Sequence, residues 1–83
     1  MAKPKGSTNE AIYARLNEMA PRINRDLGLE GDSAIGERTP YDWWKRTKAG
    51  SIDPPMPPPV IPGRYPVWIY SRVLSWYRKF KRV

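Results

Sequence analysis

The sequence predicts one mainly α-helical domain with a small β-wing. Apolar residues recur at helical spacing in three stretches, clear start and stop signals bound the middle stretch, and an extended proline-rich segment precedes the last. The 83 residues suffice for one compact core. Four Trp and five Tyr supply large apolar surface for that core, so disorder throughout the chain is not expected.

The N-terminal part predicts a short arm followed by a helix. Residues 1–6 carry two Lys, a Pro and a Gly without apolar periodicity, which indicates a flexible basic arm. The single folded domain is expected to span 7–83. Ser7 and Glu10 form the Ser-x-x-Glu pattern of a capping box, so a helix should begin there. Its inward stripe would comprise Ile12, Leu16 and Met19.

Pro21 is expected to end or kink that helix, because proline lacks an amide hydrogen and clashes with the preceding turn. Proline suits a first helical position, so a second short helix should run from Pro21 to a stop at Gly28. Residues 28–38 then form a long turn anchored by Leu29 and Ile35.

The segment from Thr39 to Gly50 carries the most complete helix signals. Thr39 is the expected N-cap, Pro40 the first helical residue, and Gly50 the stop. Asp42 near the start and the basic residues toward the end suit the helix dipole. Trp43 and Trp44 lie about 100° apart on such a helix, so one should be buried and the other at its edge.

The remainder predicts a connection, a wing and a last helix. Seven of the ten Pro fall in 51–66, which forbids a regular helix and indicates an extended connection at 51–62. Val60–Ile69 is interpreted as two short extended arms around a Pro-Gly-Arg turn. Ser71 is the expected cap of the last helix, whose core-facing residues would be Val73, Trp76 or Tyr77, and Phe80.

The residue types exclude most catalytic chemistry. Without Cys or His the chain lacks thiol nucleophiles, imidazole bases and almost every transition-metal ligand set. No nucleophile-base pair is apparent, so we expect neither an enzyme nor a cofactor. The absence of Cys and of a long apolar run indicates a cytoplasmic protein that does not enter a membrane.

The charge indicates an anionic partner. The formal net charge is +7 and the sequence pI is about 10.1. Such a balance favours phosphate binding, with a merely solvated surface as the alternative. Charge alone does not choose among DNA, RNA and anionic lipid. The Trp residues fall mostly at core spacing, so Trp44, Trp68 and Trp76 are interpreted as core rather than as stacking platforms for single-stranded bases.

Two stretches, "TPYDWWKR" and "GRYPVWIYSRVLSWY", together with the order of elements, give the chain a family likeness. It resembles the small winged helix-turn-helix proteins of the excisionase and AlpA type, relatives of the MerR DNA-binding domain. The likeness covers about residues 17–80, and the long turn at 28–38 and the proline-rich insertion depart from the pattern. It implies a phage or mobile-element protein that binds double-stranded DNA.

The helix beginning at Thr39 would then enter the major groove. Lys45 and Arg46 are candidate donors to guanine, and Asp42 a candidate acceptor from cytosine or simply a helix-start charge. The turn containing Arg64 would approach the DNA backbone or minor groove, and Tyr65 would either touch a phosphate or pack locally. The predicted DNA-binding set is Thr39, Tyr41, Asp42, Lys45, Arg46, Lys48, Arg64 and Tyr65.

The family resemblance implies an excisionase, which binds and bends DNA, associates with further copies along it, and steers an integrase toward excision. Small transcription regulators and the DNA-binding part of terminase small subunits share this likeness and are the nearest alternatives. A different class is a protein-binding adaptor that uses the proline-rich segment as a P-x-x-P ligand. The basic tail at 78–82 is interpreted as a solvated helix end, a phosphate contact or a partner surface.

Overall fold

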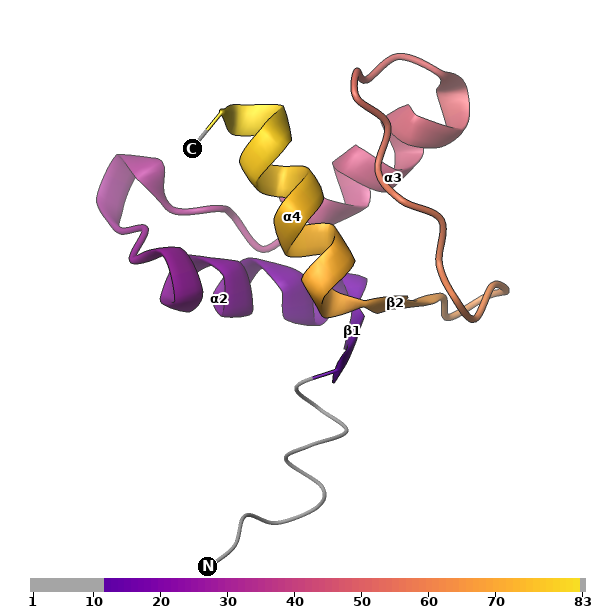
Figure 1. Ribbon diagram of the computed structural model, residues 1–83, viewed down its shortest axis with the longest axis horizontal. Helices are drawn as coiled ribbons and strands as arrows, with labels where there is room; N and C mark the ends of the chain where they lie inside the picture. The colour runs from indigo at the N-terminus through magenta and orange to yellow at the C-terminus, as the bar shows by residue number, and fades with distance from the viewer. Residues whose placement is uncertain (1–11, 83) are drawn as a thin grey trace, which may run out of the picture.

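The computed structural model describes residues 12–82, in which three α-helices pack with a small two-stranded antiparallel sheet (Figure 1). In chain order the elements are β1 (Tyr13–Arg15), α2 (Leu16–Leu27), the short 3-10 helix η1 (Gly31–Ser33), α3 (Thr39–Ala49), β2 (Val67–Ile69) and α4 (Tyr70–Lys81). The predicted arm at 1–6 and the predicted helix start at Ser7 lie outside the described residues.

Strand β1 occupies part of the segment for which helical spacing predicted a helix. Its three residues pair antiparallel with β2, and the central pair is Ala14 with Trp68. Both central residues are buried, whereas Ile12 and Tyr13 are 43% and 44% exposed. Of the predicted inward stripe, Leu16 and Met19 are buried as expected, but Ile12 is wrong, because pairing with a distant segment places Ala14 in the core instead.

Helix α2 begins at Leu16, where the carboxylate of Glu18 accepts a hydrogen bond from the Arg15 backbone N–H at 2.9 Å. It continues through Pro21, so the prediction that Pro21 ends one helix and starts another is wrong. Pro21 lies on the exposed side, while Met19 and Ile23 are fully buried and hold the helix against the core. Packing of this apolar face outweighs the local cost of the proline.

The stop at Gly28 is confirmed. Gly28 has a φ of 65°, in the left-handed region that glycine adopts without steric cost. The Leu29 N–H donates to the Asn24 carbonyl at 2.8 Å, which closes the helix end. The following turn returns to α2 through Asn24, whose side-chain amide donates to the Ile35 carbonyl and accepts from the Ile35 N–H. Ile35 is buried and Leu29 packs against the core, as predicted.

Helix α3 differs from its prediction at one end. Gly50 ends it with a φ of 74°, as expected. At the other end Thr39 is the first helical residue and Arg38 occupies the N-cap position, without a side-chain capping bond. The Thr39 cap is therefore wrong. The Arg38 carbonyl accepts instead from the backbone N–H groups of Tyr41 and Asp42, at 3.1 and 3.3 Å.

The proline-rich segment runs without helix or strand between α3 and the bridge at Ile61. Ile52 and Met56 are buried and anchor it. Indole N–H groups donate to its carbonyls, Trp68 to Pro57 at 2.7 Å and Trp76 to Pro54 at 2.8 Å. The segment is thus bound to β2 and α4, and the absence of a regular helix that its composition predicted is confirmed.

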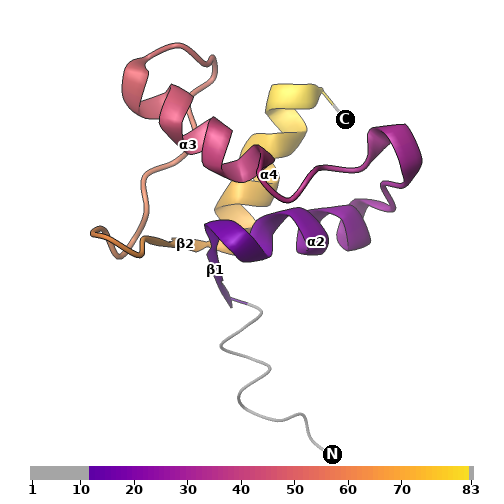
Figure 2. The same cartoon turned by 180° about the vertical axis from the view of Figure 1, so that it is seen from behind.

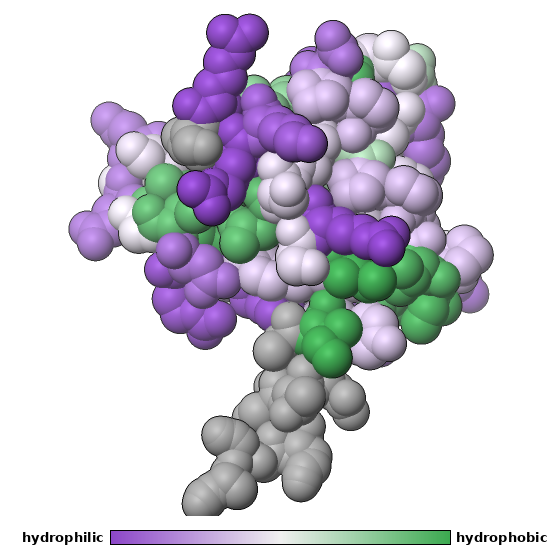
Figure 3. Space-filling view, in the orientation of Figure 1, coloured by the Kyte–Doolittle hydropathy of each residue, from purple (hydrophilic) through white to green (hydrophobic). Residues whose placement is uncertain are grey.

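The predicted pair of arms before α4 is present in part. Val67 exchanges backbone hydrogen bonds with Ile61, but this is an isolated bridge. The ladder of β2 is formed with β1, which the sequence analysis did not anticipate. Val60 and Ile61 are 40% and 53% exposed, and Figure 3 shows apolar surface near the sheet. Residues 62–66 form the loop between this bridge and β2.

Aromatic side chains join α3 to α4 and β2. Trp43 is buried and lies 5.1 Å from Trp76 and 5.5 Å from Tyr77, between ring centroids. Trp44 is half-buried and meets Trp68 edge to face at 5.2 Å. The expected split between Trp43 and Trp44 and the core assignment of Trp68 and Trp76 are confirmed. Ser71 is exposed inside α4 rather than capping it, because the helix begins at Tyr70.

Candidate nucleic-acid interface

Helix α3 presents a row of polar side chains on the side away from its core face. Pro40 and Trp43 are buried, whereas Arg38, Tyr41, Lys45 and Lys48 are exposed. These four residues, spaced three or four apart, share one side of the helix. We call them the α3 ridge. In Figure 2, α3 lies in front of α4, so the two helices lie on opposite faces of the domain.

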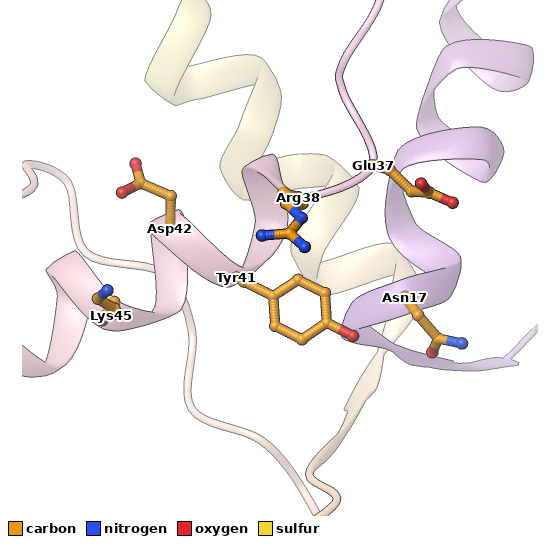
Figure 4. Close-up of a pocket in the computed structure, with 6 residues that line it drawn as sticks. All are labelled: Asn17, Glu37, Arg38, Tyr41, Asp42 and Lys45. Carbon is orange, nitrogen blue, oxygen red and sulfur yellow. The ribbon is translucent and has the colours of Figure 1, made fainter.

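A shallow depression of about 600 Å³ separates the start of α3 from the start of α2. Tyr41 lies across it, with its ring directed toward Asn17 on α2 and with Arg38 beside it (Figure 4). The lining residues are Asn17, Glu37, Arg38, Tyr41, Asp42 and Lys45. The depression brings together hydrogen-bond donors and acceptors and charges of both signs. Such a set of groups suits a surface that recognises the polar edges of bases.

Asn17 and Arg38 are candidate contact residues that the sequence analysis did not select. Asn17 belongs to this surface because β1 moves the start of α2 to Leu16, and that start faces α3. Its position had no local signal, since the predicted helix would have begun earlier. Arg38 could have been found from the sequence. It lies three residues before Tyr41 and seven before Lys45, a spacing that places all three on one side of a helix.

Arg46 and Asp42 form an ion pair with each other. The Arg46 guanidinium lies 3.8 Å from the Asp42 carboxylate, one turn earlier on the exposed surface. A second guanidinium nitrogen of Arg46 donates to the Ser51 carbonyl at 3.3 Å, beyond the helix end. Arg46 therefore closes the C-terminal end of α3, and a role in base contact would require it to leave these partners.

Lys48 is held near β2. Its ammonium lies 5.4 Å from the ring centroid of Trp44, which itself contacts Trp68 of β2. A cation over an aromatic ring retains its charge while losing some freedom. Thr39 differs from the other candidates because it is half-buried, with its hydroxyl close to Gly36. The structure thus places Thr39 at the edge of the site.

The loop at 62–66 projects from the body beside β2 (Figures 1 and 2). Gly63 has a φ of 125°, a conformation that side chains with a Cβ rarely adopt. Arg64 is exposed, and its guanidinium lies 5.9 Å from the ring centroid of Tyr65. Tyr65 is 73% exposed, so its phenol ring is available to a partner. Arg64 and Tyr65 therefore form a second candidate contact, separate from the depression.

Charge is unevenly distributed along the described chain. Residues 12–37 contain three basic and five acidic residues, whereas residues 38–82 contain ten basic and two acidic ones. Within residues 12–82 the positive charge is therefore concentrated on α3, the loop at 62–66 and α4. Across residues 12–82, no helix has the length and apolar character needed to cross a membrane. In the same part of the chain, no three acidic side chains gather in a group suited to a metal ion.

Comparisons with protein-family models, with curated protein sequences and with solved structures gave no match.

Proposed function

We propose that this protein is a non-enzymatic, sequence-specific double-stranded DNA-binding protein of winged helix-turn-helix type. Helices α2 and α3 would be the helix-turn-helix, with α3 as the recognition helix, and the loop at 62–66 would be the wing. The observation that carries the proposal is the α3 ridge, a row of three cations and a tyrosine on the open side of a helix held rigidly by its buried face.

The arrangement suggests a division of labour between base edges and phosphates. The major groove admits an α-helix, and recognition helices read bases mainly with their N-terminal residues. Tyr41 and Asn17 supply hydrogen-bonding groups at that end, and Lys45 supplies a donor for guanine. Lys48 and Arg64, farther along and on the loop, would neutralise phosphates.

Within this class we propose an excisionase that acts in the cytoplasm, where it bends DNA and steers an integrase. One structural observation favours such a role over a regulator that dimerises through its sheet. The outer edge of β1 is occupied, because Arg22 donates to the Tyr13 carbonyl at 2.7 Å and Glu18 accepts from the Arg15 N–H. An occupied edge does not accept a strand from a second copy.

Charge reversal on the ridge tests the DNA-binding proposal. A preferred duplex is first selected from a random pool, and affinity is then measured by fluorescence anisotropy between about 50 and 200 mM salt. We expect Lys45→Glu with Lys48→Glu to lower affinity by about tenfold or more, because two phosphate or base contacts become repulsive.

The matched control is Arg15→Glu with Arg25→Glu, which makes the same charge change on the acidic part of the chain and should cost about threefold or less. Equal losses in the two variants, or affinity that is insensitive to salt, would contradict docking through α3.

A footprint on the selected DNA tests the excisionase role. Several copies bound to direct repeats are expected of an excisionase, whereas one dimer on an inverted repeat would identify a regulator instead.

A further inference from the structure

Helix α4 carries a second strongly basic surface, on the face of the domain opposite the α3 ridge (Figures 1 and 2). It contains no acidic residue, and Arg82 directly follows it. Hydrophilic side chains gather over this helix in Figure 3. We call its exposed cations and hydroxyls the α4 face: Ser71, Arg72, Ser75, Arg78 and Lys79.

The α4 face borders a groove whose opposite wall is the proline-rich segment. This groove of about 520 Å³ is lined by Arg72, Ser75 and Lys79 on one side and by three prolines on the other. The wall is fixed to the helix, because the Trp76 indole donates to the Pro54 carbonyl at 2.8 Å. The cations therefore border a groove whose proline wall is hydrogen-bonded to the same helix.

The cations of the α4 face are free to meet an external anion. No ion pair joins Arg72, Arg78 or Lys79 to an acidic side chain of residues 12–82. The hydroxyls of Ser71 and Ser75 lie among these cations and add neutral donors. Cations interspersed with hydroxyl groups are the side chains that contact phosphate oxygens of a nucleic-acid backbone.

The composition of the face favours a nucleic acid over an acidic protein. Protein interfaces depend on large apolar or aromatic anchors at their centre. The exposed large hydrophobic residues of the described chain are Ile12, Tyr13, Tyr41, Val60, Ile61 and Tyr65, and none of them lies on α4. A surface of charge and hydroxyl without such anchors suits a phosphate backbone, which needs no apolar contact.

We propose that the α4 face binds the sugar-phosphate backbone of a second DNA duplex while the α3 ridge holds the first. A single copy of the protein would then bridge two duplexes, or two segments of one bent duplex. Binding by the α4 face is independent of sequence, because it reaches phosphates and no base edges. The bridging role rests on the proposed function for its first duplex, whereas phosphate binding by the α4 face does not.

Analytical ultracentrifugation with a short fluorescent duplex tests the proposal. With duplex in excess at low salt, the wild-type protein is expected to form a complex of one protein and two duplexes. Arg72→Gln with Lys79→Gln should form the complex with one duplex and lose the second, while its affinity for the selected sequence changes by about threefold or less. The control Arg15→Gln with Arg25→Gln removes two charges elsewhere and should retain both duplexes.

Two further measurements separate the possible failures. With Lys45→Gln and Lys48→Gln, affinity for the selected sequence should fall by about threefold to tenfold, while salt-sensitive, sequence-independent binding through α4 persists. Unchanged affinity for the selected sequence in Lys45→Gln with Lys48→Gln would overturn the proposed function and the bridging role, whereas phosphate binding by the α4 face would still stand. A second duplex that is retained by Arg72→Gln with Lys79→Gln would overturn the α4 proposal, as would poly-glutamate binding to the wild-type face more tightly than DNA. Unchanged circular dichroism and thermal midpoints verify that each variant is folded.

Discussion

Individual side chains complete the backbone hydrogen bonds that turns and prolines leave open in this chain. Trp68 and Trp76 donate to proline carbonyls that have no helix or strand partner, and the Thr47 hydroxyl accepts from the Met56 N–H at 3.0 Å. Asn24 does the same for both backbone groups of Ile35. Buried polar groups left without partners are costly, so these few residues hold long irregular segments in place.

Replacement of Asn24 should loosen the turn that positions α3. Asn24→Ala removes both bonds to Ile35 and is expected to lower the free energy of unfolding by about 2 kcal/mol. Asn24→Asp keeps the acceptor for the Ile35 N–H but loses the donor to its carbonyl, so about half of that loss is expected. Urea denaturation followed by circular dichroism measures both. Equal stability of Asn24→Ala and the wild type would show that the clamp contributes nothing.

Two buried tyrosines predict how stability depends on alkaline pH. Burial raises the pKa of Tyr70, and its hydrogen bond to Asp26 at 2.7 Å raises it further; burial also raises the pKa of Tyr77. In the unfolded chain tyrosine titrates near pH 10. The contribution of the two tyrosines to the free energy of unfolding is therefore complete below about pH 10. It is lost as pH rises further, because the unfolded chain releases the phenol protons at a lower pH than the folded protein does.

Urea denaturation at a series of pH values from about 8 to about 11 measures this loss. Tyr70→Phe with Tyr77→Phe should make the decline in stability at alkaline pH shallower, because both phenols with raised pKa values are removed. The control is Tyr65→Phe, which alters an exposed ring and should leave the slope unchanged. An equally steep decline in the double variant would contradict the assignment.

At the scale of elements, packing overrides local preference at α2 and β1. Pro21 lies within α2 although it cannot donate to the Asn17 carbonyl one turn earlier. The helix persists because the side chains of Met19, Ala20 and Ile23 are buried on its other face. β1 is three residues long and exists through its pairing with β2. Both elements depend on the rest of the domain.

Pro21→Ala should stabilise the protein. The substitution restores the helix hydrogen bond and removes the ring clash, a gain of about 1–3 kcal/mol, less about 0.4–1 kcal/mol for the extra freedom of the unfolded chain. Pro40→Ala is the contrasting control, since Pro40 lies in the first turn of α3 and is fully buried, so its removal should destabilise. Thermal unfolding compares the two, and a loss of stability in Pro21→Ala would contradict this account.

At the scale of the whole molecule, one aromatic cluster joins the face of α3 to that of α4. Trp43 contacts Trp76 and Tyr77, and Trp76 stacks on Phe80 with ring centroids 4.9 Å apart. A domain of this size has a small margin of stability, so this cluster decides whether the two basic faces keep their relative orientation. The DNA binding proposed for α3 would thus depend on residues that lie mostly in the core.

Trp43→Ala should cost about 3–5 kcal/mol, a large part of the total stability of a small domain. The matched change Trp44→Ala removes a half-buried indole and should cost less, because the cavity opens to solvent. Circular dichroism at increasing urea concentration ranks the variants. If Trp44→Ala were the more damaging, the main core would lie between α3 and β2 rather than between α3 and α4.

The sequence by itself determined the elements whose signals are local. Gly28 and Gly50 stop their helices because a left-handed residue is required there, and α4 follows from apolar spacing within twelve residues. The same local spacing predicted most of the exposed face of α3, including Tyr41, Lys45 and Lys48. Interactions between residues three or four apart suffice for such predictions.

The tertiary structure decided everything that depends on distant partners. β1 forms because β2 lies beside it, and α2 continues through Pro21 because its other face is buried. Arg46 donates to the Ser51 carbonyl at the end of its own helix instead of facing solvent alone. Asn17 entered the candidate site because the first turn of α2 lies against α3. The reason is that burial and strand pairing are gained between segments far apart in the chain, and their free energy exceeds the local preferences that a sequence displays.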